Sequence, residues 1–119
     1  MRVLIVDDSR TARMMLRKVL PPALGADVLE AAGGSEALRR VETERIDLMF
    51  LDLTMPEVDG YQVLKTLKDA GRALPTIVVS ADIQPLAQQR VRDLGALAFV
   101  KKSLSPHDLA SVLQGAGLL

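Results

Sequence analysis

The 119-residue sequence predicts an α/β fold in which a doubly wound, five-stranded parallel sheet carries helices on both faces, (βα)5 in chain order. Three observations support this. Short apolar runs alternate five times with longer amphipathic segments. The runs are continuous, which is typical of parallel strands buried on both faces. Apolar residues form 49% of the chain, and its length fits a single domain over residues 1–119.

The first strand–helix pair has clear boundaries. Residues 3–6 are apolar and mostly β-branched, so they predict a buried strand. Asp8 and Ser9 follow as candidate N-caps, and the apolar residues after them recur at helical spacing. Pro21-Pro22 ends this helix.

The second pair and the third strand follow the same pattern. A weaker strand is expected over residues 27–31. Gly33-Gly34 separates it from a helix that begins with Ser35 and runs to about Glu44. Residues 46–51 predict a strong buried strand.

The second half of the chain completes the alternation. A loop over residues 54–60 precedes a helix marked by apolar residues between Tyr61 and Leu67, and Pro75 introduces a strand over 76–79. The remaining predicted elements are a less regular helix with Leu86, Val91 and Leu94, closed by Gly95; a short strand over 98–100; and a helix to about Gln114, with Ser105 as N-cap and Pro106 at its first position.

Composition excludes several classes of protein. The 15 Lys and Arg residues balance 15 Asp and Glu residues, whereas polyanion binders need an excess of positive charge. The absence of Cys excludes disulfide scaffolds and thiol catalysis, and a lone His excludes a multi-histidine metal site. No signal peptide is recognisable, and no apolar stretch approaches the ~20 residues that span a bilayer. We therefore expect a cytoplasmic protein that binds neither nucleic acid nor membranes.

Polar residues stand where the apolar strands end. Asp7 and Asp8 follow the first strand, Asp52 the third, Ser80 the fourth, and Lys101-Lys102 the fifth. Parallel strands place their carboxyl ends at one edge of the sheet, where ligands bind, so these side chains should converge. Clustered carboxylates need a counter-charge to stay ionised, and oxygen ligands suit Mg²⁺. A phosphate ligand would complete the Mg²⁺ shell and pair with the lysine.

Taken singly, these residues have plainer interpretations. An Asp-Asp pair after a strand is most often a helix N-cap, a Ser is a turn residue and a Lys pair is a solvated edge. Asp52 is harder to explain in this way, because an Asp that closes a buried strand needs partners. The coincidence of all of them at one end of successive strands favours a site.

The motifs resemble those of the receiver domains of bacterial response regulators, the chemotaxis-regulator (CheY-like) type. The resemblance runs from Val3 to about Leu113, and its most specific part is the Asp-x-x-Met-Pro-x-x-Asp-Gly stretch from Asp52 to Gly60. It implies a flavodoxin-like three-layer sandwich and a phosphorylation switch in two-component signal transduction.

The resemblance also implies roles for individual residues. Asp52 would accept a phosphoryl group from a histidine kinase, a histidine phosphotransfer protein or a small phosphodonor. Asp7, Asp8, Asp52 and the backbone carbonyl of Thr54 would hold Mg²⁺. Lys102 would pair with the phosphoryl group. The protein would assist its own phosphoryl transfer and autodephosphorylation without being an enzyme for other substrates.

Two further residues would transmit the switch. Ser80 would hydrogen-bond the phosphoryl group and move inward, and the rotamer of Phe99 would follow. The surface of the fourth helix, fifth strand and fifth helix would then engage a downstream protein target. A monomer or a phosphorylation-dependent dimer is expected.

Strand alternation does not choose between Lys101 and Lys102, because neighbouring residues point to opposite sides. The order of motifs in the family selects Lys102. Ser103 departs from the family, which usually has a Pro with a cis bond here. Because a cis bond before a non-proline residue costs ~3 kcal/mol, we expect a trans bond or a remodelled loop. Thr54 and Asp82 occupy positions that vary in the family and should tune autodephosphorylation.

Arg10, Arg13 and Arg17 form a stripe on the first predicted helix, with Met14 among them. We interpret it as a solvated face. The alternative is a docking surface for the phosphotransfer helix of a kinase, with Met14 as an adaptable apolar contact.

Two other functions compete with the phosphorylation switch. One is a receiver-like scaffold that binds partners without phosphorylation, which Ser103 favours and the acidic residues oppose. The other is a Mg²⁺-dependent phosphatase, which needs a second Asp two residues after its nucleophile as acid and base. Thr54 stands at that position.

Overall fold

The fold of the computed structural model, which describes residues 1–81, 84–102 and 104–119, is the predicted α/β sandwich. Within these residues five parallel strands form one sheet in the order β2-β1-β3-β4-β5. The elements are β1 (Arg2–Val6), α1 (Arg10–Val19), a 3₁₀ turn η1 (Pro22–Leu24), β2 (Asp27–Ala31), α2 (Gly34–Thr43), β3 (Leu48–Leu51), α3 (Gly60–Asp69), β4 (Thr76–Ser80), α4 (Pro85–Asp93), β5 (Ala98–Lys101) and α5 (Pro106–Gly115).

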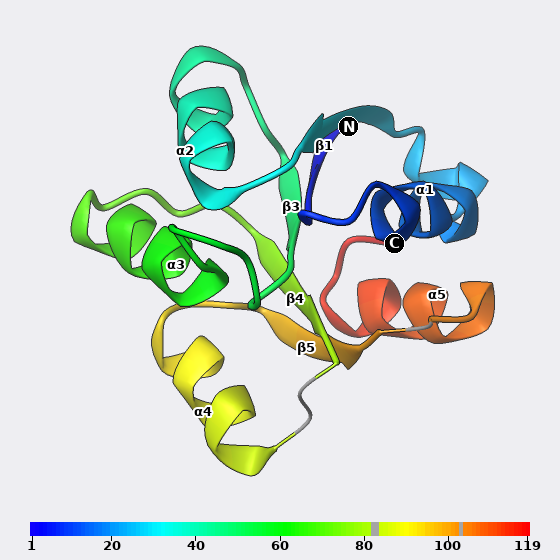
Figure 1. Cartoon of the computed structure of the whole chain (residues 1–119). Helices are drawn as coiled ribbons and strands as arrows, with labels where there is room; N and C mark the ends of the chain where they lie inside the picture. Colours follow the sequence, from blue (N-terminus) through cyan, green and yellow to red (C-terminus); the bar gives the residue numbers. More distant parts are fainter. Residues whose placement is uncertain (82–83, 103) are drawn as a thin grey trace.

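The two faces of the sheet have separate cores. Helices α2, α3 and α4 cover one face, and α1 and α5 cover the other (Figure 1). The central strands β1, β3 and β4 supply alternate residues to the two faces, and their apolar side chains are almost completely buried. Burial on both faces explains why these strands are continuous apolar runs in the sequence.

Two helices begin with a serine cap that the sequence predicts. The side chain of Ser9 accepts a hydrogen bond from the N–H of Ala12 at 3.2 Å, and that of Ser105 accepts one from Asp108 at 3.1 Å. Asp59 and Gln62 form a reciprocal capping box at the start of α3. This cap fixes the end of the loop that begins at the carboxyl end of β3.

Strand β3 begins two residues later than predicted, at Leu48. The carboxylate of Asp47 accepts the backbone N–H of Arg2 at 2.8 Å, and the N–H of Asp47 donates to the carbonyl of Arg2 at 2.8 Å. Asp47 therefore holds the start of β1 from outside the strand. No helix among the described residues is long and apolar enough to cross a membrane.

The strand order reverses between β1 and β3, which lie side by side although β2 and α2 separate them in the sequence. Helices following the strands on either side of this reversal lie on opposite faces of the sheet, α1 on one and α3 on the other. The carboxyl ends of β1 and β3 are therefore left open between them, as in other doubly wound sheets.

Gly60 lies in close contact with the backbone that follows β3. A Cβ at this position would meet the carbonyl oxygen of Asp52 and approach Cα of Leu53 to 2.9 Å. We expect Gly60→Ala to lower the free energy of unfolding in urea by about 1–3 kcal/mol, because the obstructing atoms belong to the backbone. Gly115→Ala is the matched control, since a Cβ on that helical glycine meets nothing within 4 Å. Equal stability of the two variants would contradict the prediction.

Candidate functional site

Three carboxylates meet at the reversal point of the sheet. Asp7 follows β1, Asp52 follows the neighbouring strand β3, and Asp8 completes the group. Each offers a carboxylate oxygen, and these oxygens all lie within 4.8 Å of one another. Asp7 and Asp52 are buried, with 6% and 3% of their surface exposed, whereas Asp8 is exposed. The predicted convergence of these side chains is confirmed.

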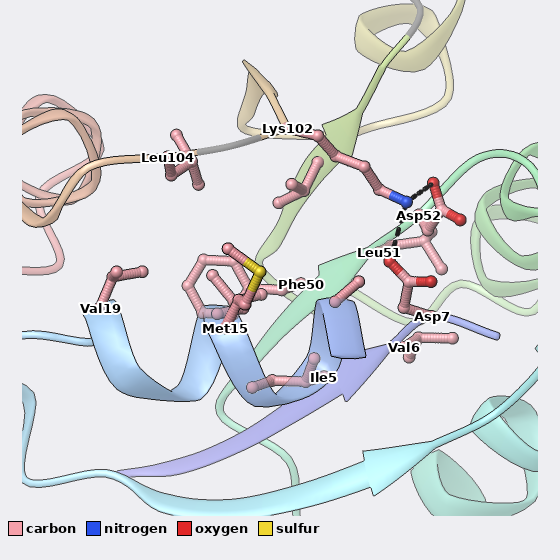
Figure 2. Close-up of a pocket in the computed structure, with 13 residues that line it drawn as sticks. Ile5, Val6, Asp7, Met15, Val19, Phe50, Leu51, Asp52, Lys102 and Leu104 are labelled. Carbon is pink, nitrogen blue, oxygen red and sulfur yellow. Dashed lines mark ion pairs between the residues drawn. The ribbon is translucent and has the colours of Figure 1, made fainter. Parts of the chain in front are cut away.

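Lys102 provides positive charge at the same point. Its Nζ lies 3.0 Å from Oδ2 of Asp7 and 3.4 Å from Oδ1 of Asp52, and the close-up shows the side chain directed at both carboxylates (Figure 2). Its backbone N–H donates to the carbonyl of Ser80 at 2.9 Å, so β4 fixes the position of its main chain. Lys101 is exposed, so the choice of Lys102 as the lysine facing the carboxylates is confirmed.

The electrostatics of the cluster are unbalanced. Burial and the nearby charge of Asp7 raise the pKa of Asp52, against the opposing effects of Lys102 and of the hydrogen bond from the backbone of Thr54. Burial tends to lower the pKa of Lys102, but its hydrogen bond with Asp7 and the charges of Asp52 and Asp7 raise it overall. The ammonium group therefore stays charged at neutral pH, while the ionised form of Asp52 is disfavoured until more positive charge is added.

The donor set fits a hard divalent cation. Carboxylate oxygens within 4.8 Å of one another are close enough to share one ion, and oxygen ligands with room for water are those Mg²⁺ prefers. An ion would also supply the positive charge that burial of Asp7 and Asp52 demands. The side chain of Thr54, in the loop after β3, is exposed, and its backbone carbonyl stays a predicted ligand.

Ser80 and Phe99 lie on the two strands farther along the sheet. Ser80 ends β4 and is 1% exposed, opposite Lys101 in the strand register. Phe99 pairs with Val78 and is partly buried against the core on the side of α2, α3 and α4. The positions suit the predicted switch, whose movement stays a prediction. The expectations for Ser103 and Asp82 concern residues outside those described.

For Arg13, the prediction of a solvated face is wrong. The side chain of Arg13 is only 14% exposed: Nε lies 2.8 Å from Oε1 of Glu30 on β2, and Nη1 donates to the backbone carbonyl of Asp7 at 2.6 Å. The sequence contains a signal for this contact. Glu30 is two residues from Val28 in β2, so both side chains point to the face of the sheet that α1 covers. Because α1 covers that face, a basic residue of α1 is expected to pair with the Glu30 carboxylate.

An apolar cavity of about 160 Å³ adjoins the carboxylates (Figure 2). The cavity lies under α1. No residue of this helix is fully buried, and Met15, which lines the cavity, is 55% exposed. Asp7, Asp52 and Lys102 line its polar end, and the rest of the wall is apolar: Ile5, Val6, Ala12, Met15, Leu16, Val19, Phe50, Leu51, Val79 and Leu104. This wall keeps one side of the acidic cluster in apolar surroundings, which strengthens the interactions between its charges.

Comparison with known proteins gives consistent matches. A family model described as "Response regulator receiver domain" matches residues 3–114. The chain is 34% identical over 115 residues to the two-component response regulator ORR41 of Oryza sativa subsp. japonica, covering 94% of this chain and 91% of that protein. The solved structure of chemotaxis protein CheY4 from Vibrio cholerae is similar with a TM-score of 0.85 and 30% identity, covering 97% of both chains.

Other relatives are longer than this chain. The alkaline phosphatase synthesis transcriptional regulatory protein PhoP of Bacillus subtilis is 32% identical over 108 residues, which cover 91% of this chain and 45% of that protein. The chain likewise spans less than half the length of several further relatives. The similarity to these proteins therefore concerns one part of each.

The charge imbalance gives a prediction about stability. At a free Mg²⁺ concentration ten times its Kd, the ion should add about 1.4 kcal/mol to the free energy of unfolding and raise Tm by roughly 5 °C. Without metal, Asp52→Asn should melt above the wild type, because it removes a buried charge next to Asp7. Thermal melts of both proteins with and without MgCl₂ measure these effects. An Asp52→Asn variant that melts below the metal-free wild type would refute the electrostatic argument.

Proposed function

This chain belongs to the response regulator receiver domain family, and from that premise we propose that Asp52 is its phosphoacceptor, phosphorylated in a Mg²⁺-dependent reaction that switches a protein-interaction surface. Receiver domains act in two-component signalling, between histidine kinases and downstream targets. One observation carries the proposal: the buried carboxylate of Asp52 lies in reach of two other carboxylates and 3.4 Å from the ammonium group of Lys102.

The proposed reaction uses Asp52 as nucleophile. One of its carboxylate oxygens forms a bond to phosphorus as the bond from phosphorus to the donor's imidazole nitrogen breaks, which yields an acyl phosphate and a free histidine side chain. Transfer of this kind depends on in-line positioning and on neutralising the charge of the phosphoryl oxygens. Lys102 pairs with one of these oxygens. Asp7, Asp8, Asp52 and the carbonyl of Thr54 hold Mg²⁺, which when bound supplies the remaining positive charge.

The same residues serve the removal of the phosphoryl group by hydrolysis. Water attacks the phosphoryl group of the acyl phosphate, so that Asp52 is regenerated and phosphate leaves. Thr54 borders this path and is proposed to influence the rate of autodephosphorylation. The protein thus assists both its own phosphorylation and its own dephosphorylation.

Phosphorylation adds negative charge between β3 and the end of β4. Ser80 and Lys102 are proposed to turn toward the new oxygens, and Phe99 on β5 is proposed to change rotamer with Ser80. The surface formed by α4, β5 and α5 then presents a different face to a downstream protein. We propose a single receiver domain in the cytoplasm that is a monomer or dimerises on phosphorylation, with a histidine kinase or a histidine phosphotransfer protein as its donor.

Phosphorylation of Asp52 is directly measurable. Incubation with MgCl₂ and acetyl phosphate or phosphoramidate should add the mass of one phosphoryl group, which alkali removes because acyl phosphates are labile. Intact-mass spectrometry measures the product. The Asp52→Asn variant and wild-type protein with EDTA should both show no gain. A wild-type protein that gains no mass with any donor would favour a scaffold that binds partners unphosphorylated, and steady release of phosphate from varied monoesters would favour a phosphatase.

The role of Lys102 has a matched control in its neighbour. Lys102→Ala should slow phosphorylation by acetyl phosphate roughly hundredfold, because it removes a charged donor aimed at the transferred group. Lys101→Ala removes the same charge from the exposed position next to it and should react within about twofold of the wild type. The rate of mass gain at fixed donor concentration measures both. Equal slowing of the two variants would assign the effect to overall charge and contradict a direct role for Lys102.

A further inference from the structure

Arg13 joins three elements at the back of the acidic cluster. Its Nη1 donates to the backbone carbonyl of Asp7 at 2.6 Å, and its Nε lies 2.8 Å from Oε1 of Glu30. The guanidinium group therefore links α1, the loop after β1, and β2. A side chain with a permanent charge and 14% exposure is costly to bury without such partners.

Asp7 is held by four contacts among the described residues. Its carbonyl accepts from Arg13, its Oδ1 accepts the N–H of Ser9 at 2.9 Å, and its Oδ2 lies 3.0 Å from Nζ of Lys102. Ser9 is close in sequence, and Lys102 approaches from the side of β5. The N–H of Asp7 donates directly to the carbonyl of Ala31 on β2 at 3.1 Å. Arg13 adds a second restraint by holding the carbonyl of Asp7, with Glu30 on β2 as its anchor. The carbonyl of Asp7 therefore has a restraint that comes from α1 and not from the sheet itself.

We propose that Arg13 is a positioning residue for the divalent cation: it holds the main chain of Asp7 so that the Asp7 carboxylate stays directed at Asp52. The inference rests on the proposed function in one respect, since it takes Asp7 as a ligand of the ion. Arg13 touches neither the ion nor the phosphoryl group. It acts through the Asp7 carbonyl, with Glu30 as its anchor.

The chemistry of the side chain makes the role specific to arginine. The planar guanidinium presents donors in two directions and so serves the Asp7 carbonyl and the Glu30 carboxylate together. A lysine has one nitrogen on a flexible stem and is a poor replacement for this double contact. Arg17 offers a natural comparison: its Nη2 lies 3.1 Å from Oε2 of the same Glu30, but its own side chain is 49% exposed and its hydrogen bond is to the carbonyl of Val28.

The test is a titration of the folded protein with MgCl₂ by isothermal calorimetry. Arg13→Lys should weaken Mg²⁺ binding by about tenfold, the effect expected when a group that orients a metal ligand is lost. Arg17→Ala removes a salt bridge to the same Glu30 and should bind Mg²⁺ within about twofold of the wild type. Urea unfolding of each variant shows whether loss of affinity merely follows loss of stability.

Each outcome decides the proposal. Wild-type affinity in Arg13→Lys overturns it, and so does an equal loss of affinity in Arg17→Ala. If Arg13→Lys does not fold, Glu30→Gln replaces it; this variant should bind Mg²⁺ several-fold more weakly, and unchanged binding overturns the proposal. A wild-type protein that binds no Mg²⁺ overturns the proposed function and this inference together. A wild-type protein that binds Mg²⁺ no more tightly than Arg13→Lys overturns only the role of Arg13.

Discussion

The site holds two buried carboxylates, those of Asp7 and Asp52, close enough to repel each other when both are ionised. The parallel sheet places Asp7 and Asp52 directly after adjacent strands at the same edge, where burial and mutual repulsion disfavour the ionised form of Asp52. Lys102 offsets part of this repulsion from the loop after β5. The remaining imbalance favours an added cation.

The surrounding fold opposes relaxation of this arrangement. Gly60 lets the start of α3 approach the backbone of Asp52, and Asp59 and Gln62 hold that start by capping it. The carbonyl of Ser80 accepts a hydrogen bond from the backbone N–H of Lys102. The backbone next to the buried carboxylates therefore has little freedom to move them apart. Their closeness lowers the free energy of unfolding, a cost that is common at functional sites. The cores on the two faces of the sheet supply the stability that the site lacks.

Much of this could be predicted from the sequence, because the determinants are local or follow from topology. Continuous apolar runs predict parallel strands, and parallel strands bring Asp7, Asp52 and Lys102 to one edge. Strand alternation left Lys101 and Lys102 equivalent, because the turn that orients the lysine depends on the backbone contact with Ser80. Helical periodicity alone does not predict the burial of Arg13, because the signal lies in another element: strand alternation places Glu30 on the face of β2 that α1 covers.

The three carboxylates differ in how firmly they are held, and the difference matches the proposed division of work. Asp7 is restrained at its carbonyl and at both carboxylate oxygens, as suits a ligand that must hold still. Asp8 is exposed, so it can exchange contacts with water as an ion arrives. Asp52 is buried beside an apolar cavity, and this burial, together with the nearby charge of Asp7, raises its pKa and so destabilises its charged form. Formation of a bond to phosphorus would replace the single charge of Asp52 by the larger charge of the phosphoryl oxygens, so the product needs the positive charge of Lys102 and of an added cation even more than the unmodified site does. Were Asp7 the nucleophile, the reacting atom would belong to the most restrained group of the three.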